Sequence, residues 1–355
     1  MDYLETGRLV ASVLTRSWRR EPPEPEVTAA QLAEVAPILV RTGAGGLAWW
    51  RVRASALRNC PAAQSLRQAF GEQAFRSGFY EAAVAEAVSR VRAIGVEPVV
   101  LKGVGVARLY PAKGLRQPGD VDLAVPHENR AAAEAALDGR RFAHFDVDFS
   151  HLEYSDLLAG DFDSFLARCD TLDVAGVDIR VPRPEDAFRY LCMHYLRHYG
   201  YRPLWLCDIA AALEALPERF DWNECLGTDE RVANWVLSAA GLACRLLGAE
   251  PSRRAPGFEP SPDWVADAVL RLWGRGQVKV YQPRLVPIAP MHDVVSTASL
   301  RRPLEPWRAA RTRWRDPYEF TIDTRRPFER TPPTLPRVGD AIRRAARFLA
   351  SREGA

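Results

Sequence analysis

The sequence predicts an α+β fold, in which a small mixed β-sheet has helices on one face and is flanked by N-terminal and C-terminal helical regions. Two observations lead to this prediction. Short strand-like segments with one or two helices between them fill the middle of the chain, and apolar residues recur at helical spacing on both sides of it. We therefore divide the chain into residues 1–95 (helical), 96–182 (the sheet), 183–280 (helical) and 281–355 (rich in proline and arginine, ending in an amphipathic helix).

The first region contains two clear helix signals. Thr28 and Gln31 have the spacing of a capping box, in which each side chain hydrogen-bonds the other residue's backbone, so a helix should begin there. A proline-rich linker, Arg16–Glu26, precedes it. Ala63–Ile94 is a long segment with apolar residues at helical spacing and almost no helix breakers, which predicts one long helix.

The middle region alternates between short strands and short helices. Apolar runs and apolar–polar alternation predict the strands, and glycines separate them from the helices. The expected strands are Val99–Leu101, Asp120–Val125, Phe142–Phe149 and Gly176–Val181, and the expected helices are Gly103–Tyr110 and His127–Leu137.

Helical patterns return after residue 183. Pro184 suits the first turn of a helix, and the acids Glu185 and Asp186 beside it suit the positive end of the helix dipole. Further helices are expected at Leu204–Leu216, Glu230–Leu247 and Pro262–Trp273, the last one ending at Gly274, and a final amphipathic helix at about Arg337–Arg352.

The composition excludes several classes of protein. With 48 basic and 45 acidic residues, a net charge of +3 is too balanced to indicate nucleic acid as the partner. Six scattered cysteines without a CxxC pair indicate neither a zinc site nor a disulfide framework and favour the cytoplasm. We find no secretory signal and no apolar run long enough for a membrane span, and the alanine- and arginine-rich composition is typical of bacteria.

Two pairs of aspartates suggest a metal site. Asp120 and Asp122 are two residues apart in a predicted strand and so share a face, as do Asp146 and Asp148 in another. Like charges so close repel, but a divalent cation such as Mg²⁺ or Mn²⁺ between them offsets the repulsion. If the two strands are neighbours, the acids converge, and such a site can hold two metal ions about 3.5–4 Å apart for phosphoryl transfer.

The turn at Lys102 and Gly103 supplies a complementary feature. Glycine lets the backbone approach a ligand closely, the following helix offers free N–H groups, and lysine adds a positive charge for phosphate. The turn is neither a Walker A loop nor a dinucleotide-binding fingerprint. An aspartate pair alone is more often a solvated strand face, whereas the ordered set of strand, Lys-Gly turn, helix and acidic strands is more specific.

The segments VLKG, LYP and GLRQPGDVDLAV, together with LCMHYLRHYG and LWLCDIA, resemble a bacterial branch of the polymerase-β-like nucleotidyltransferases over about residues 95–215. The resemblance implies metal-dependent transfer of a nucleoside monophosphate from a nucleoside triphosphate, most simply ATP, with release of pyrophosphate. The acceptor would be a hydroxyl on a small molecule or peptide.

The resemblance also assigns roles to individual residues. Asp120 and Asp122 become metal ligands, and Asp146 becomes the third carboxylate that helps to activate the acceptor. Asp148 stands where the branch often has histidine, and the third ligand stays open between Asp146, Asp148 and Asp178. Lys102 and Gly103 replace the Gly-Ser pair of the wider superfamily, so the lysine takes over the contact to phosphate.

Further residues have both a functional and a structural interpretation. Arg116 either binds a phosphate or holds a loop carbonyl. His194 and His198, one helical turn apart without the glutamate of HExxH, either line the nucleotide cleft or pack in the core. Asp208 either orients one of these histidines or caps a helix.

Two rival functions remain at this stage. One is a toxin-like transferase that acts on tRNA or on protein, although the balanced charge does not favour nucleic acid. The other is a nucleotide-binding protein that has lost catalysis, which the replaced Gly-Ser pair allows and the retained acids oppose. No membrane partner is expected.

Overall fold

The computed structural model describes residues 2–137, 141–142, 145–149, 161–276 and 317–330. The chain forms two compact units, Met1–Val278 and Lys279–Ala355. Within the second unit, the described residues form helix α15 (Pro317–Thr324). The helix predicted at Arg337–Arg352 lies outside the described residues.

The described strands form one mixed sheet in the order β3-β4-β2-β1-β6-β5. In the centre, β1 pairs antiparallel with β2 and parallel with β6, while β2 pairs parallel with β4. This arrangement confirms the predicted α+β class with a small mixed sheet. The strands are β1 (Val99–Val100), β2 (Val121–Ala124), β3 (Arg141–Phe142), β4 (Phe145–Phe149), β5 (Asp170–Val174) and β6 (Val177–Val181).

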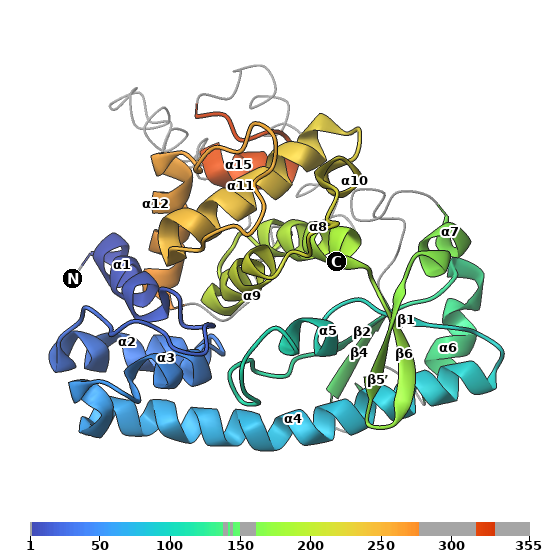
Figure 1. The fold of residues 1–355 in the computed structure, drawn as a ribbon, viewed down its shortest axis with the longest axis horizontal. Coiled ribbons are helices and arrows are strands. Elements are labelled where there is room, and N and C mark those ends of the chain that lie inside the picture. Colours follow the sequence, from blue (N-terminus) through green and yellow to red (C-terminus); the bar gives the residue numbers. More distant parts are fainter. Residues whose placement is uncertain (1, 138–140, 143–144, 150–160, 277–316, 331–355) are drawn as a thin grey trace, which may run out of the picture. The chain divides into compact units, whose positions relative to one another are not determined.

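Helices precede, interrupt and follow the sheet (Figure 1). Before and within the sheet they are α1 (Tyr3–Leu14), α2 (Ala29–Arg41), α3 (Gly45–Val52), the 3₁₀ turn η1 (Ala56–Asn59), α4 (Pro61–Ala93), α5 (Val104–Ala107), the 3₁₀ turn η2 (His127–Asn129), α6 (Arg130–Ala136) and α7 (Phe162–Ala167). After the sheet they are α8 (Pro184–Arg197), α9 (Pro203–Glu214), α10 (Trp222–Leu226), α11 (Glu230–Leu247) and α12 (Asp263–Arg275). None of the helices in the described part of the chain is both long and apolar enough to cross a membrane.

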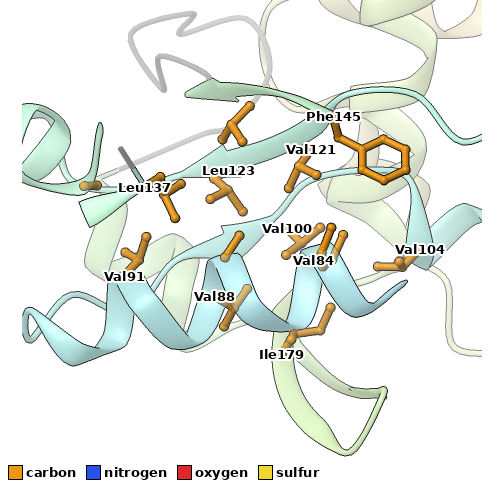
Figure 2. Close-up of a cluster of buried hydrophobic side chains, with 14 of the residues drawn as sticks. Val84, Val88, Val91, Val100, Val104, Val121, Leu123, Leu137, Phe145 and Ile179 are labelled. Atoms are coloured by element: carbon orange, nitrogen blue, oxygen red, sulfur yellow. The ribbon is translucent and has the colours of Figure 1, made fainter. Parts of the chain in front are cut away.

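The long helix α4 covers one face of the sheet. Val84 and Val88 on this helix pack against Val100, Val121 and Leu123 on the strands (Figure 2). Each such side chain contributes about 1.5–3 kcal/mol when it is fully buried. Because Val121 and Leu123 face α4, the residue between them, Asp122, faces the opposite side of the sheet.

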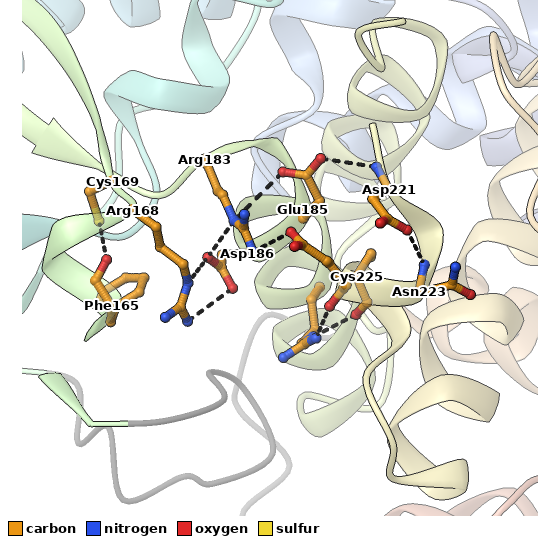
Figure 3. A network of polar contacts seen from close by, with 11 residues as sticks. Phe165, Arg168, Cys169, Arg183, Glu185, Asp186, Asp221, Asn223 and Cys225 are labelled. Atoms are coloured by element: carbon orange, nitrogen blue, oxygen red, sulfur yellow. Dashed lines mark hydrogen bonds and ion pairs between the residues drawn. The ribbon is translucent and has the colours of Figure 1, made fainter. Parts of the chain in front are cut away.

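Helix α8 is held at its N-terminus by a network of ion pairs (Figure 3). Asp186 accepts hydrogen bonds from Arg168, at the end of α7, and from Arg183, and Glu185 accepts one from the backbone N–H of Asp221. The end of α7 and the start of α10 are thus tied to the first turn of α8. This helix carries both predicted site histidines, so the network helps to determine where they lie.

Several local predictions are confirmed. The side chain of Thr28 accepts from the backbone of Gln31, and the Gln31 side chain accepts in return, so the capping box is present. Pro184 occupies the first turn of α8, and α11 has the predicted bounds Glu230–Leu247. The predicted helix Ala63–Ile94 corresponds to α4, which has 33 residues.

Other local predictions are wrong. The expected strand Phe142–Phe149 is two strands, since Phe142 in β3 pairs antiparallel with Phe145 in β4. Strand β5 was missed, because it is a mostly exposed edge strand with aspartates and no apolar run. Helix α12 continues through Gly274 and ends at Gly276, which has the left-handed conformation that favours glycine at helix ends.

Candidate active site

The two acidic strands are direct neighbours in the sheet. Strand β2 runs parallel to β4, with Val121 opposite Val147 and Asp122 opposite Asp148. The same register, continued by one residue, brings position 146 opposite position 120. Paired strands lie about 4.8 Å apart, so the backbone brings the four acidic positions into one patch.

The alternation of the strands puts this patch on the face away from α4. Phe145, Val147 and Phe149 are buried in the core that α4 covers. Positions 146 and 148 between them therefore belong to the same face as Asp122. The side chains of Asp146 and Asp148 are outside the described part, so the choice between them as third carboxylate stays a prediction.

The two acids of β2 differ in their surroundings. Asp120, just before the strand, is exposed, whereas the carboxylate of Asp122 is only 6% exposed. Lys102 reaches Asp122 from the turn after β1, with its Nζ 3.2 Å from Oδ1. The sequence placed Lys102 near phosphate; the structure shows that it also pairs with a predicted metal ligand.

The turn at Gly103 allows this approach and requires a glycine. Gly103 has a φ of 82° and immediately precedes α5. A Cβ on this residue would lie 2.1 Å from the Tyr80 hydroxyl, which itself donates a hydrogen bond to the backbone oxygen of Asp120. Tyr80 thus connects α4 with both the turn and the start of β2, a role with no signal in the sequence.

Helix α8 brings its histidines to the same side. His194 Nε2 lies 3.3 Å from Lys102 Nζ, and the His194 and His198 rings are 4.6 Å apart. Trp205 of α9 contacts both rings, at 4.6 and 5.2 Å between centroids. The structure therefore brings His194 to the site through Lys102, and Trp205 is a neighbour that the sequence analysis did not single out.

The surroundings of the histidines favour their neutral forms. Burial, and then the positive charge of Lys102, lowers the pKa of His194 well below its usual value of 6.5. The same two causes lower the pKa of His198 to about 4. A neutral His194 has an unprotonated ring nitrogen, and that nitrogen accepts a hydrogen bond from the Lys102 ammonium.

Arg116 has a structural partner. Its Nε donates to both carboxylate oxygens of Asp208 in α9, at 3.0 and 3.1 Å, and Tyr110 donates to the same group at 2.7 Å. The Arg116 and Asp208 side chains are 8% and 1% exposed. The sequence predicted a phosphate or a loop carbonyl as the partner of Arg116, and a histidine or a helix end as the partner of Asp208. The structure pairs the two side chains with each other, which joins the loop before β2 to α9; the contact of Arg116 with phosphate stays a prediction.

The donor set fits a hard divalent cation. Carboxylate oxygens are the ligands that Mg²⁺ prefers, and Asp122 already holds the cationic Lys102. Among the side chains that the structure describes, no group of three or more acids, histidines or cysteines is placed to bind a metal. This finding does not cover Asp146 and Asp148, because their side chains are outside the described part. Asp178 is separated from β2 by β1, so it does not belong to the patch.

A pocket of about 470 Å³ lies behind the turn. It is lined by Tyr80, Gly103 and Arg116, and also by Arg108 and by residues 172–175 at the tip of the β5–β6 hairpin. The pocket combines apolar surface with charged groups at its edge. It is large enough for a small organic molecule next to the turn.

The comparisons with known proteins agree with this picture. The α+β fold with its small mixed sheet is consistent with a nucleotidyltransferase core. The model of a family described as uncharacterised nucleotidyltransferases matches residues 28–248, and the chain belongs to this family. The protein is therefore a nucleotidyltransferase. The comparisons with curated proteins and with solved structures gave no match.

Proposed function

We propose that the protein transfers a nucleoside monophosphate from a nucleoside triphosphate, most simply ATP, to a hydroxyl on a small molecule or peptide. The observation that carries the proposal is the register of β2 and β4, in which Asp122 pairs with Asp148 on the face opposite α4. The Lys102-Gly103 turn lies beside this patch, because Lys102 contacts Asp122 directly.

Each residue has a part in the proposed reaction. Asp120, Asp122 and one acid of β4 hold Mg²⁺ or Mn²⁺, which would neutralise phosphate charge and make the acceptor hydroxyl more acidic. The turn at Gly103 receives the triphosphate, and Lys102 donates a hydrogen bond to it. His194 keeps the Lys102 ammonium in place by accepting another of its hydrogen bonds.

The bond changes follow from these positions. The acceptor oxygen attacks the α-phosphorus, the bond from that phosphorus to the oxygen bridging to the β-phosphorus breaks, and pyrophosphate leaves. The hydroxyl proton passes to the carboxylate of β4, which is Asp146 if the resemblance to the polymerase-β-like enzymes holds. Positioning and charge neutralisation supply most of the rate enhancement in reactions of this type.

A small or peptide acceptor agrees with the charge and with the pocket. The chain has nearly equal numbers of acidic and basic residues, which does not favour a polyanion such as tRNA. The pocket beside Gly103 has the volume of a small-molecule site, and its lining includes the turn but not Asp120 or Asp122.

The test begins with binding, because binding does not depend on knowing the acceptor. We expect the purified chain to bind at least one of ATP, GTP, CTP and UTP when Mn²⁺ is present, and Asp122→Asn to abolish this binding. Asp178→Asn, an exposed aspartate on β6, is the matched control and should bind normally. If none of the four triphosphates binds in the presence of Mn²⁺, the proposal is contradicted.

The second stage identifies the acceptor. The chain is incubated with an α-³²P-labelled form of the triphosphate that binds and with fractionated small molecules and peptides from a bacterial extract. We expect one fraction to gain label while pyrophosphate appears in equal amount. Labelling of added tRNA instead would support the rival transferase on nucleic acid.

A further inference from the structure

The ammonium of Lys102 has neighbours on three sides. Its Nζ lies 3.2 Å from Asp122 Oδ1 and 3.3 Å from His194 Nε2, and 6.0 Å from the ring centroid of Trp205. The lysine side chain is only 11% exposed. The lysine ammonium is a compact positive charge at the end of a flexible stem.

The backbone directs this charge at the acids. Gly103 turns sharply after Lys102, and the Tyr80 hydroxyl closes the space on the other side of the turn. Tyr80 also holds the backbone of Asp120 through a hydrogen bond of 3.1 Å. The position of Lys102 relative to β2 is therefore set by three different segments, α4, α8 and the turn itself.

The ammonium contacts the acid that two metal ions would share. In a two-metal site the ions are about 3.5–4 Å apart and share a carboxylate ligand. Asp122 is the central acid of the patch, since it has Asp120 beside it on its own strand and Asp148 opposite on β4. The Lys102 ammonium, 3.2 Å from Oδ1 of this acid, already supplies a positive charge to it.

The neighbouring histidine favours the same arrangement. His194 accepts a hydrogen bond from Lys102 and adds no positive charge while it is neutral. Burial lowers the pKa of His194, and the neighbouring basic groups Lys102, His198, Arg116 and Arg197 lower it further. Of the three N–H donors of the ammonium, one is directed at Asp122 and one at His194. We assign the third to an oxygen of the substrate.

We propose that Lys102 replaces one of the two metal ions, so that the site binds a single divalent cation and the ammonium supplies the second positive charge. This inference rests on the proposed function, because it assumes that the acids of β2 and β4 bind a metal together with the triphosphate. It predicts that removal of the ammonium opens a second metal site at Asp122.

The experiment counts bound Mn²⁺ ions. Wild-type chain, Lys102→Met and the control Lys113→Met are dialysed to equilibrium against Mn²⁺ with a saturating α,β-methylene analogue of the triphosphate that binds, and Mn²⁺ in excess of that in the buffer is measured by electron paramagnetic resonance. Methionine keeps an unbranched side chain of nearly the same length and removes the charge. Lys113 is an exposed lysine paired with Glu81, so its loss should not change the count.

We expect about one Mn²⁺ per chain for the wild type and for Lys113→Met, and about two for Lys102→Met. Two ions in the wild type, or one in a folded Lys102→Met, would overturn the inference about Lys102 and leave the proposed function intact. No bound Mn²⁺ in any chain would overturn both. If Lys102→Met does not fold, Lys102→Gln takes its place, and the wild-type count by itself can still contradict the inference.

Discussion

Two buried ion pairs lie near the start of β2, and they differ in the geometry with which each cation contacts its carboxylate. Arg116 donates to both oxygens of Asp208, which also accepts from Tyr110. Lys102 contacts one oxygen of Asp122 from a flexible side chain. The first pair has the geometry of a permanent link between loop and helix, while the second can rearrange around a ligand.

Burial of a charge does not by itself identify a catalytic residue. Asp208 is more deeply buried than Asp122, with side chains 1% and 6% exposed. Only Asp122 lies in an acidic patch with a neighbouring strand that continues it. Variants at each pair test whether Lys102 and Asp122 serve the reaction while Arg116 and Asp208 stabilise the fold.

The largest effect is expected for Asp122→Asn. Loss of this carboxylate should lower nucleotidyl transfer by roughly 100-fold or more, because charge stabilisation in the transition state is lost. Stability should change little, because the substitution also removes repulsion within the acidic patch and the long lysine side chain can turn towards water. Pyrophosphate release and a urea denaturation curve of the same preparation check both parts. Asp208→Asn should show the opposite pattern, and a loss of activity in it without loss of stability would break the comparison.

Arg116→Ala should give the largest loss of stability. It leaves the carboxylate of Asp208 buried without its cation, which costs about 3–5 kcal/mol of unfolding free energy. The measurement is chemical denaturation. Lys113→Ala, which removes the exposed pair with Glu81, is the control and should cost about 0–1 kcal/mol. Equal losses in the two variants would show that Arg116 is not a structural link.

Gly103→Ala tests the turn that carries Lys102. A side chain at a φ of 82° and 2.1 Å from the Tyr80 hydroxyl should cost about 1–3 kcal/mol. Tyr80→Phe removes that oxygen together with its hydrogen bond to Asp120. In a double-mutant cycle the pair should therefore be less destabilising than the sum of the single variants. Simple additivity would mean that the hydroxyl does not restrict the turn.

The smallest effect concerns pH. His198 has a pKa lowered to about 4 in the folded chain against about 6.5 when unfolded, so between these values the unfolded state binds more protons. The unfolding free energy should therefore fall as the pH drops from 6.5 towards 4, by at most about 1.4 kcal/mol per pH unit for this residue. Denaturation curves at pH 7, 6 and 5 measure the slope. His198→Gln should reduce the slope but not remove it, because the pKa of His194 is lowered as well. An unchanged slope would assign it to groups other than His198.

The sequence predicted local features better than contacts between distant segments. The pattern of β2 already placed Asp122 on the face opposite Val121 and Leu123, because alternation in a strand is a local property. The capping box at Thr28 and the bounds of α11 depend equally on nearby residues. A reversal between Phe142 and Phe145 leaves apolar periodicity intact, so two strands were taken for one.

The partners of the site residues could not be predicted in the same way. Arg116 and Asp208 are 92 residues apart, and so are Lys102 and His194. Tyr80 is 40 residues from Asp120 and lies in a helix whose pattern indicates only burial. Only the packing of α4, α8 and α9 brings these residues together.

The most direct test of the central claim is a crystal structure with Mn²⁺ and an α,β-methylene triphosphate, in which anomalous scattering locates the metal. The account predicts Mn²⁺ bound directly to Asp122 and to a carboxylate of β4, with the triphosphate at the Gly103 turn. A triphosphate bound elsewhere, or a metal that contacts neither β2 nor β4, would contradict it.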